Sequence, residues 1–317
     1  MCLLSSLVCW VIAVSLFVVG ETFAMATVSN NKIGVFGCGV LGTSLCRQLL
    51  ETPEFQGWTV TGITKTTNNH ESILEKVGKD ERFRVCTSTE TSSEKFQHVV
   101  FCAPPSGFDD YAGAVRDAIT TNWNKEDGGT FVFTSSGGIY GPGGVSEDVE
   151  VVDESTPTAS ADSSPRSARL VQAEEACISN GGIVLRLAGL YTLERGAHNY
   201  WFERTGGVVK GHPDSVVNLL HYDDAAGSCV AALKQGGASL AATSQKIFLV
   251  SDGNPTTRKG ICASALKSKR YAENNSMPTF EFDPATATRG KIYNGEKTNE
   301  LLKWKPRYES FDSFMQL

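Results

Sequence analysis

Three glycines with the spacing G-x-G-x-x-G lie in the segment GVFGCGVLGTSL, after a β-branched run and at the start of a helical pattern. In a dinucleotide-binding turn, the first glycine permits the tight turn, the second lets the backbone approach a diphosphate, and the third packs helix against strand. The free amides at the helix N-terminus then bind the phosphates. The spacing predicts a dinucleotide site made by Gly37, Cys38, Gly39, Val40, Leu41 and Gly42.

The end of the second predicted strand, Gly62-Ile63-Thr64-Lys65-Thr66, indicates which coenzyme to expect. A free ribose 2′-hydroxyl usually meets an Asp or Glu about 20 residues after the glycines. No acid stands here, and Lys65 with Thr64 could hold a 2′-phosphate through its charge and hydroxyl donors. We therefore expect NADP rather than NAD, and the alternative is that Lys65 is a solvated loop lysine.

The elements that must position this turn follow from the apolar periodicity. From Lys32 onward, short β-branched runs alternate with helical stretches, which is typical of a parallel sheet covered by helices on both faces. The expected strands are Ile33–Phe36, Thr59–Ile63, Phe83–Cys86, His98–Cys102, Thr130–Thr134, Ile183–Leu187 and Lys246–Val250, and the expected helices are Leu41–Leu50, Tyr111–Asn122, Ala168–Ser179 and Asp224–Gln235. The acidic and then Ser/Thr/Pro-rich stretch Glu147–Ser167 is expected to be an exposed loop.

Composition excludes several function classes. The chain has 317 residues, of which 41% are hydrophobic, so it can bury a large core. Its net charge is −6 and it has no basic run, which argues against nucleic acid as a partner. Its nine cysteines form no CxxC motif or zinc-type spacing, so we expect neither a disulfide scaffold nor a metal site.

Three further blocks, FTSSGGIYG (133–141), LRLAGLY (185–191) and LLHYDDAA (219–226), resemble the short-chain dehydrogenase/reductase superfamily in its extended, epimerase/dehydratase-like form. The turn GCGVLG and the segment FCAPPSG (101–107) resemble the atypical subgroup of that form. The resemblance implies an α/β Rossmann fold, a doubly wound parallel sheet, with a small C-terminal substrate lobe drawn largely from residues 188–214 and 253–317 of a domain spanning 27–317. It also implies that Ala103, Pro104 and Ser135 contact the dinucleotide.

The superfamily's chemistry is hydride transfer at a nicotinamide, assisted by a Tyr-x-x-x-Lys pair and a serine that polarises the substrate oxygen. The resemblance places that serine on Ser136. The tyrosine position falls on Arg166 with the lysine on Leu170, or one residue earlier on Pro165 with Arg169, so either register lacks the acid/base. Arginine cannot donate a proton near neutral pH, but it can bind an anion. Ser136, Arg166 and Tyr140 are therefore the candidate catalytic residues; Tyr191, His198 and His221 are further candidate acids.

Two functions are consistent with these residues. The first is an NAD(P)-dependent oxidoreductase or epimerase/dehydratase-like enzyme that acts on a small carbonyl or sugar-type substrate. The second is an inactive NADP(H)-binding regulatory or sensor protein, which the missing Tyr-x-x-x-Lys pair favours. In both cases the expected partner is a small molecule, and a homodimer stays open.

The first 26 residues are expected to lie outside the fold. Leu3–Val19 is an uncharged apolar run of 17 residues followed by Ala24-Met25-Ala26, which is typical of a cleavable signal. The odd number of cysteines that remain is typical of a reducing compartment, which favours the plastid stroma reached through the secretory route. The alternatives are the endoplasmic reticulum and an uncleaved membrane anchor; without the signal, no membrane association is expected.

Overall fold

The computed structural model describes residues 31–160, 164–236, 240, 243–273 and 276–317. The predicted signal segment, residues 1–26, lies outside the described residues and stays a prediction. Among the described helices, none is long and apolar enough to cross a bilayer.

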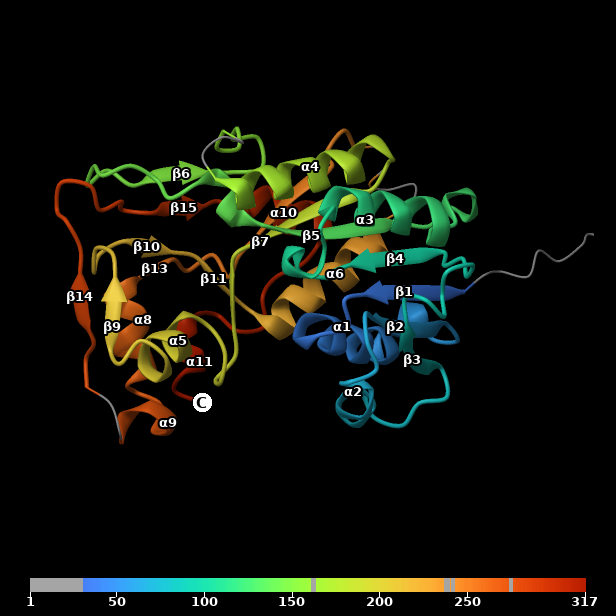
Figure 1. Cartoon of the computed structure of the whole chain (residues 1–317), viewed down its shortest axis with the longest axis horizontal. Helices are drawn as coiled ribbons and strands as arrows, with labels where there is room; N and C mark the ends of the chain where they lie inside the picture. Colours follow the sequence, from blue (N-terminus) through green and yellow to red (C-terminus); the bar gives the residue numbers. More distant parts are fainter. Residues whose placement is uncertain (1–30, 161–163, 237–239, 241–242, 274–275) are drawn as a thin grey trace, which may run out of the picture.

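A seven-stranded parallel sheet forms the larger half of the molecule (Figure 1). Its strands follow the order β12-β7-β5-β4-β1-β2-β3: β2 and β3 are added on one side of β1, and β4 and the later strands on the other side. Every neighbouring pair is parallel, and this confirms the predicted Rossmann sheet. The strands are β1 (Lys32–Phe36), β2 (Thr59–Thr64), β3 (Phe83–Thr87), β4 (His98–Phe101), β5 (Phe131–Ser136), β7 (Ile183–Leu187) and β12 (Ile247–Val250).

Helices cover both faces of the sheet, because its central strands are buried on both sides. Helices α3 and α4 pack on one face, and α1 and α6 on the other (Figure 1). Each face has its own apolar cluster, one centred on Leu45 and Leu49 of α1 and the other on Phe101 and Phe133. The helices are α1 (Val40–Glu51), α2 (His70–Val77), α3 (Tyr111–Asp117), α4 (Pro165–Ser179) and α6 (Tyr222–Gln235), with short helical turns η1 (Pro53–Phe55), η2 (Pro105–Gly107), η4 (Lys125–Asp127) and η5 (Gly137–Tyr140).

The structure corrects three details of the expected elements. The helix expected over Tyr111–Asn122 is α-helical only as far as Asp117 and continues as a π-helix, η3 (Ala118–Asn122). Helix α2 escaped detection because it is only eight residues long and its apolar residues are limited to Ile73, Leu74 and Val77. The loop expected over Glu147–Ser167 contains a strand, β6 (Glu150–Val152), that pairs with β15 (Lys291–Tyr293).

A smaller lobe lies beside the sheet, with its own core around Trp201, Phe202, Tyr271 and Phe311 (Figure 1). Most of it comes from the two ranges expected for a substrate lobe. Helix α10, although inside the second range, packs back against α6 and β12. The remaining elements are β8 (Gly189–Tyr191), α5 (Ala197–Glu203), β9 (Val208–Lys210), β10 (Val216–Val217), β11 (Leu219–His221), β13 (Thr256–Thr257), α8 (Arg258–Ala265), α9 (Lys269–Ala272), β14 (Thr279–Glu281), α10 (Glu296–Leu302) and α11 (Phe311–Phe314).

One buried carboxylate makes the stability of this fold depend on pH. Asp252 follows β12, is 6% exposed, and its Oδ2 atom has no hydrogen-bond partner in the described part of the chain. Burial raises the pKa of Asp252 to about 7, and Asp224 adds to the rise. The folded state therefore holds a proton that the unfolded state releases near pH 4, so this group's stabilising contribution is lost as pH rises toward 7.

We expect Asp252→Asn to stabilise the protein at pH 8 by roughly 1–3 kcal/mol relative to the wild type, and to have much less effect at pH 4. The reason is that the amide cannot ionise. Urea unfolding at both pH values measures the difference, and Asp283→Asn at an exposed position is the control. A stability difference that does not change with pH would contradict the assignment.

Candidate functional site

The turn between β1 and α1 has the geometry that the glycine spacing predicts. Gly37 has a φ of +88°, and a Cβ atom on it would lie 2.3 Å from the backbone nitrogen of Ala103. At Gly42, a Cβ would lie 2.7 Å from the Gly37 carbonyl oxygen. A Cβ on Gly39 would meet nothing nearer than 4.0 Å, so space is left beside this residue. The first and third glycines thus allow close packing, and the second leaves room for a ligand.

Helix α1 begins at this turn without a side-chain cap. Its first intrahelical hydrogen bond runs from the Thr43 amide to the Gly39 carbonyl oxygen, 2.8 Å apart. The amides of Val40, Leu41 and Gly42 precede that bond and therefore have no partner within the helix. Unpaired amides at a helix N-terminus favour an anion, so the turn fits a diphosphate.

The turn opens into a cleft of about 1270 Å³ at the carboxyl ends of the strands. Predicted coenzyme residues that line it are Gly37, Cys38, Gly39, Val40, Leu41, Thr64, Lys65, Ala103, Pro104 and Ser135, and the predicted catalytic residues that line it are Ser136 and Arg166. Gly42 packs beneath the turn instead, against the Gly37 carbonyl. The cleft is large enough for a dinucleotide together with a small substrate.

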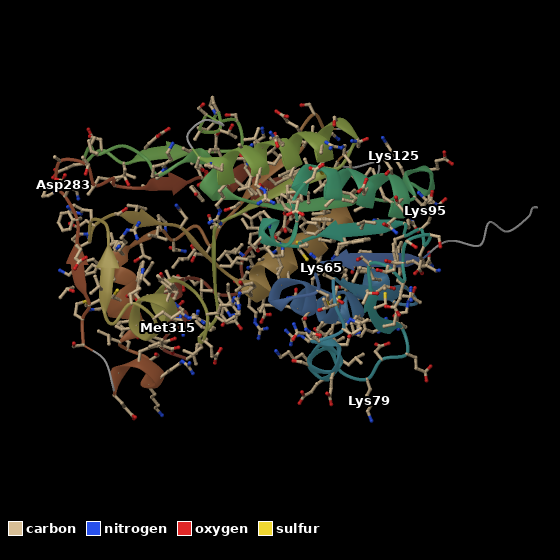
Figure 2. The ribbon with its side chains drawn as sticks, viewed as in Figure 1. Lys65, Lys79, Lys95, Lys125, Asp283 and Met315 are labelled. Carbon is tan, nitrogen blue, oxygen red and sulfur yellow. The ribbon has the colours of Figure 1, made fainter. Side chains whose placement is uncertain are left out.

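At one end of the cleft, the loops after β2 and β3 present amines, amides and hydroxyls. This part of the lining consists of Thr64, Lys65, Thr66, Asn69, Ser88 and Ser92, none of which is acidic. The Lys65 ammonium donates to the carbonyl oxygen of Gly107, another residue of the cleft lining, at 3.1 Å. Figure 2 shows Lys65 toward the middle of the molecule, whereas Lys79 lies at its periphery. The Thr64 hydroxyl is already bonded to His70, 2.7 Å away.

Two serines at the end of β5 reach the same cleft. The Ser136 Oγ accepts a hydrogen bond from the Gly138 amide at 3.2 Å, which leaves the hydroxyl hydrogen to be donated elsewhere. Next to it, the Ser135 Oγ is buried and has no hydrogen-bond partner in the described part of the chain. A buried hydroxyl without a hydrogen-bond partner destabilises the folded protein. A ligand that forms a hydrogen bond with Ser135 would remove this cost, which favours its binding.

Tyr140 does not lie where a substrate in the cleft could reach it. Its side chain is 2% exposed, and its hydroxyl donates to the Asp153 carbonyl oxygen at 2.7 Å. The same hydroxyl accepts from the Arg186 guanidinium at 2.9 Å, and Arg186 in turn forms a buried ion pair with Glu174. Burial raises the pKa of Tyr140. The residue therefore belongs to a buried polar network beneath the site.

The other candidate acids also lie away from the cleft lining. Tyr191 is 1% exposed, and burial raises its pKa far above the ordinary range. His198 is bonded to the Leu193 carbonyl oxygen at 3.1 Å, and burial lowers its pKa. His221 caps α6 by accepting from the Asp223 amide. Each of these side chains is used for packing or capping.

The start of α4 presents Arg166 and Leu170 to the cleft, the positions expected for the tyrosine and lysine of the superfamily. Arg169, the residue before Leu170, is not part of the cleft lining. Its guanidinium donates to the carbonyl oxygens of Pro105, at 2.9 Å, and of Phe108. Arg169 therefore connects α4 to the loop that carries Ala103. The Arg166 side chain lines the cleft and brings a positive charge to it.

Two cleft residues, Arg195 and Tyr222, were not singled out as site residues from the sequence. The Arg195 Nε donates to the Tyr222 hydroxyl at 3.1 Å, and both side chains line the cleft. They are 27 residues apart, and no local motif joins them. Their proximity follows from the parallel pairing of β8 with β11.

Known structures share this architecture, although no protein-family model matches the sequence and no curated protein matches it. A UDP-Glc/GlcNAc 4-epimerase from Campylobacter jejuni aligns with 90% of this chain and 97% of its own, at 17% identity and a TM-score of 0.68. A dTDP-glucose 4,6-dehydratase from Bacillus anthracis in complex with NAD aligns over 90% and 94%, at 16% and 0.67. A Silicibacter pomeroyi protein of unknown function aligns over 90% and 96%, at 19% and 0.65.

The chain shares the fold of these proteins. This confirms, at the level of the fold, the resemblance to epimerase/dehydratase-like proteins that the sequence indicated.

Two glycine substitutions in the turn should separate folding from binding. We expect Gly37→Ala to lower the free energy of unfolding by at least about 2 kcal/mol, because the new Cβ would sit at positive φ against the Ala103 backbone. Gly39→Ala has room and negative φ, so we expect it to change stability by less than about 0.5 kcal/mol but to weaken dinucleotide binding. Urea unfolding and calorimetry test the pair; equal stability losses would contradict the assigned roles.

Proposed function

We propose that this protein is an NADP(H)-dependent enzyme of the oxidoreductase or epimerase/dehydratase type, acting on a small carbonyl or sugar-type substrate. The observation that carries the proposal is one shared cleft. It brings the uncapped start of α1, the open space at Gly39 and the Ser136 hydroxyl together. A nicotinamide coenzyme bound there would supply or accept a hydride.

Residues of this chain would hold the coenzyme from both walls. The amides at the start of α1 would bind its diphosphate, and the backbone of Ala103 and Pro104 would line the groove. Ser135 has a buried hydroxyl that lacks a partner, and a polar group of the coenzyme would satisfy it.

Ser136 and Arg166 would act on the substrate. With the Gly138 amide donating to its oxygen, the Ser136 hydroxyl can donate its hydrogen to a substrate carbonyl oxygen. The Arg166 charge would stabilise negative charge that develops on that oxygen. Serine and arginine side chains do not act as acids near neutral pH, so the proton that a reduced carbonyl oxygen takes up would come from a water molecule.

The substrate class is supported by the fold neighbours, two of which are named for the epimerisation and dehydration of sugar nucleotides. Their identity to this chain is below 20%, so we propose the class and no particular sugar.

NADP is proposed over NAD on a local observation, although the Bacillus anthracis neighbour was solved with NAD. The lining after β2 and β3 carries Lys65 and several hydroxyls, and no carboxylate that would bind a free 2′-hydroxyl or repel a 2′-phosphate.

We expect Lys65→Glu to weaken NADPH binding by roughly tenfold or more and NADH binding far less, because only NADPH carries the 2′-phosphate. Lys79→Glu makes the same charge change at the periphery and is the control. Calorimetric titration with both coenzymes measures the ratio. Equal losses of affinity for NADPH and NADH would show that Lys65 does not bind the 2′-phosphate.

Turnover can be tested by incubating the protein with 4-labelled NADPH and a library of carbonyl compounds and sugar nucleotides. We expect label to reach a product, and Ser136→Ala to slow the transfer by about 100-fold while coenzyme binding is kept. Ser72→Ala, the same change at an exposed position of α2 outside the cleft lining, is the control. Saturable NADPH binding with no transfer to any compound would favour the competing interpretation, an inactive NADP(H)-binding regulatory protein.

A further inference from the structure

One positively charged side chain of the cleft lining, that of Arg195, has no role in the proposed mechanism. Arg195 is exposed, lines the cleft, and forms no ion pair in the part of the chain that the structure describes. Its one side-chain hydrogen bond there runs from Nε to the Tyr222 hydroxyl, so its two Nη groups are left to bind a ligand. Because the Tyr222 hydroxyl accepts this bond, its own hydrogen is also left to be donated. The pair thus offers several donors and one positive charge.

Both residues are held in place by their surroundings. Arg195 closes a tight turn after β8, in which the Thr192 amide donates to the Arg195 carbonyl oxygen at 2.8 Å. Tyr222 is the first residue of α6, and the next residue, Asp223, is bound to α1. The Asp223 carboxylate accepts from the Ser44 hydroxyl at 2.5 Å, and its carbonyl oxygen accepts from the Gln48 side chain at 2.8 Å.

These contacts place Tyr222 beside the first turns of α1. Ser44 lies one turn after Val40, where the unpaired amides of α1 begin. The backbone amides and the Arg195–Tyr222 pair therefore approach the same part of the cleft from two different segments. The carboxylates that line the cleft come from another segment, around the start of α3 and along it: Asp109, Asp110 and Asp117.

We propose that Arg195 and Tyr222 form a side-chain clamp for a diphosphate group, which completes the backbone site at the start of α1. The proposal rests on the proposed coenzyme site and extends it. The diphosphate could be that of the coenzyme or that of a nucleoside-diphosphate substrate. A guanidinium with a hydroxyl donor suits either, since it offers bidentate, charge-assisted hydrogen bonds to phosphate oxygens.

The test compares Arg195→Ala and Tyr222→Phe with Arg204→Ala, an exposed arginine outside the cleft lining. The probes are NADPH and NADH added to the free protein, and UDP added to protein saturated with NADPH, all by calorimetry. If the coenzyme is the source, Arg195→Ala should weaken NADPH and NADH by the same factor, about tenfold, and Tyr222→Phe by about threefold. If a substrate is the source, only UDP binding should weaken by these factors.

Several results would overturn the clamp. Unchanged affinity in all titrations would do so, and so would a loss confined to NADPH, because that would place Arg195 at the 2′-phosphate. An equal loss in Arg204→Ala would show a general charge effect. If the wild type bound neither coenzyme, the proposed function would fail by itself, and UDP titrated into the coenzyme-free protein would then test the clamp alone.

Discussion

The site depends on one close approach of two backbone segments. Gly37 lies so near Ala103 that no side chain fits between them, and the Cys102 amide donates to the Phe36 carbonyl oxygen at 2.8 Å. On the other side, the Gly37 amide donates to the Ile63 carbonyl oxygen at 2.9 Å. The ends of β1, β2 and β4 are thereby fixed to one another. Helix α1 begins at their junction with unpaired amides facing the cleft.

Four arginines near the site have three different environments. Arg169 ties α4 to the loop after β4, and Arg186 holds Glu174 and Tyr140 in the core. Arg166 and Arg195 instead keep their charges at the cleft. The same residue type therefore serves as a structural link where carbonyls or carboxylates surround it, and is left able to bind an anion where they do not. This distribution suits a ligand that carries phosphate or carboxylate groups.

Much of the sheet could be predicted, because buried parallel strands form continuous β-branched runs that need no partner to be recognised. The glycine turn was equally local. Helix α2 was missed because it is short and has only three apolar residues. Strand β6 was missed because the acidic residues around it are typical of a loop, and its pairing with β15 comes from a distant part of the chain. The smaller lobe could be located only by resemblance, because its strands have two or three residues each.

By itself, the sequence determined most strands of the sheet with the helices that cover them, the glycine turn, and the absence of a Tyr-x-x-x-Lys pair at the start of α4, because each of these depends on neighbouring residues. Only the tertiary structure decided that Tyr140 faces the core and that Arg195 meets Tyr222. The physical reason is that a side chain's partner depends on the register of strands far apart along the chain. The pairing of Gly189 with Leu219 and of Tyr191 with His221 sets that register for Arg195 and Tyr222.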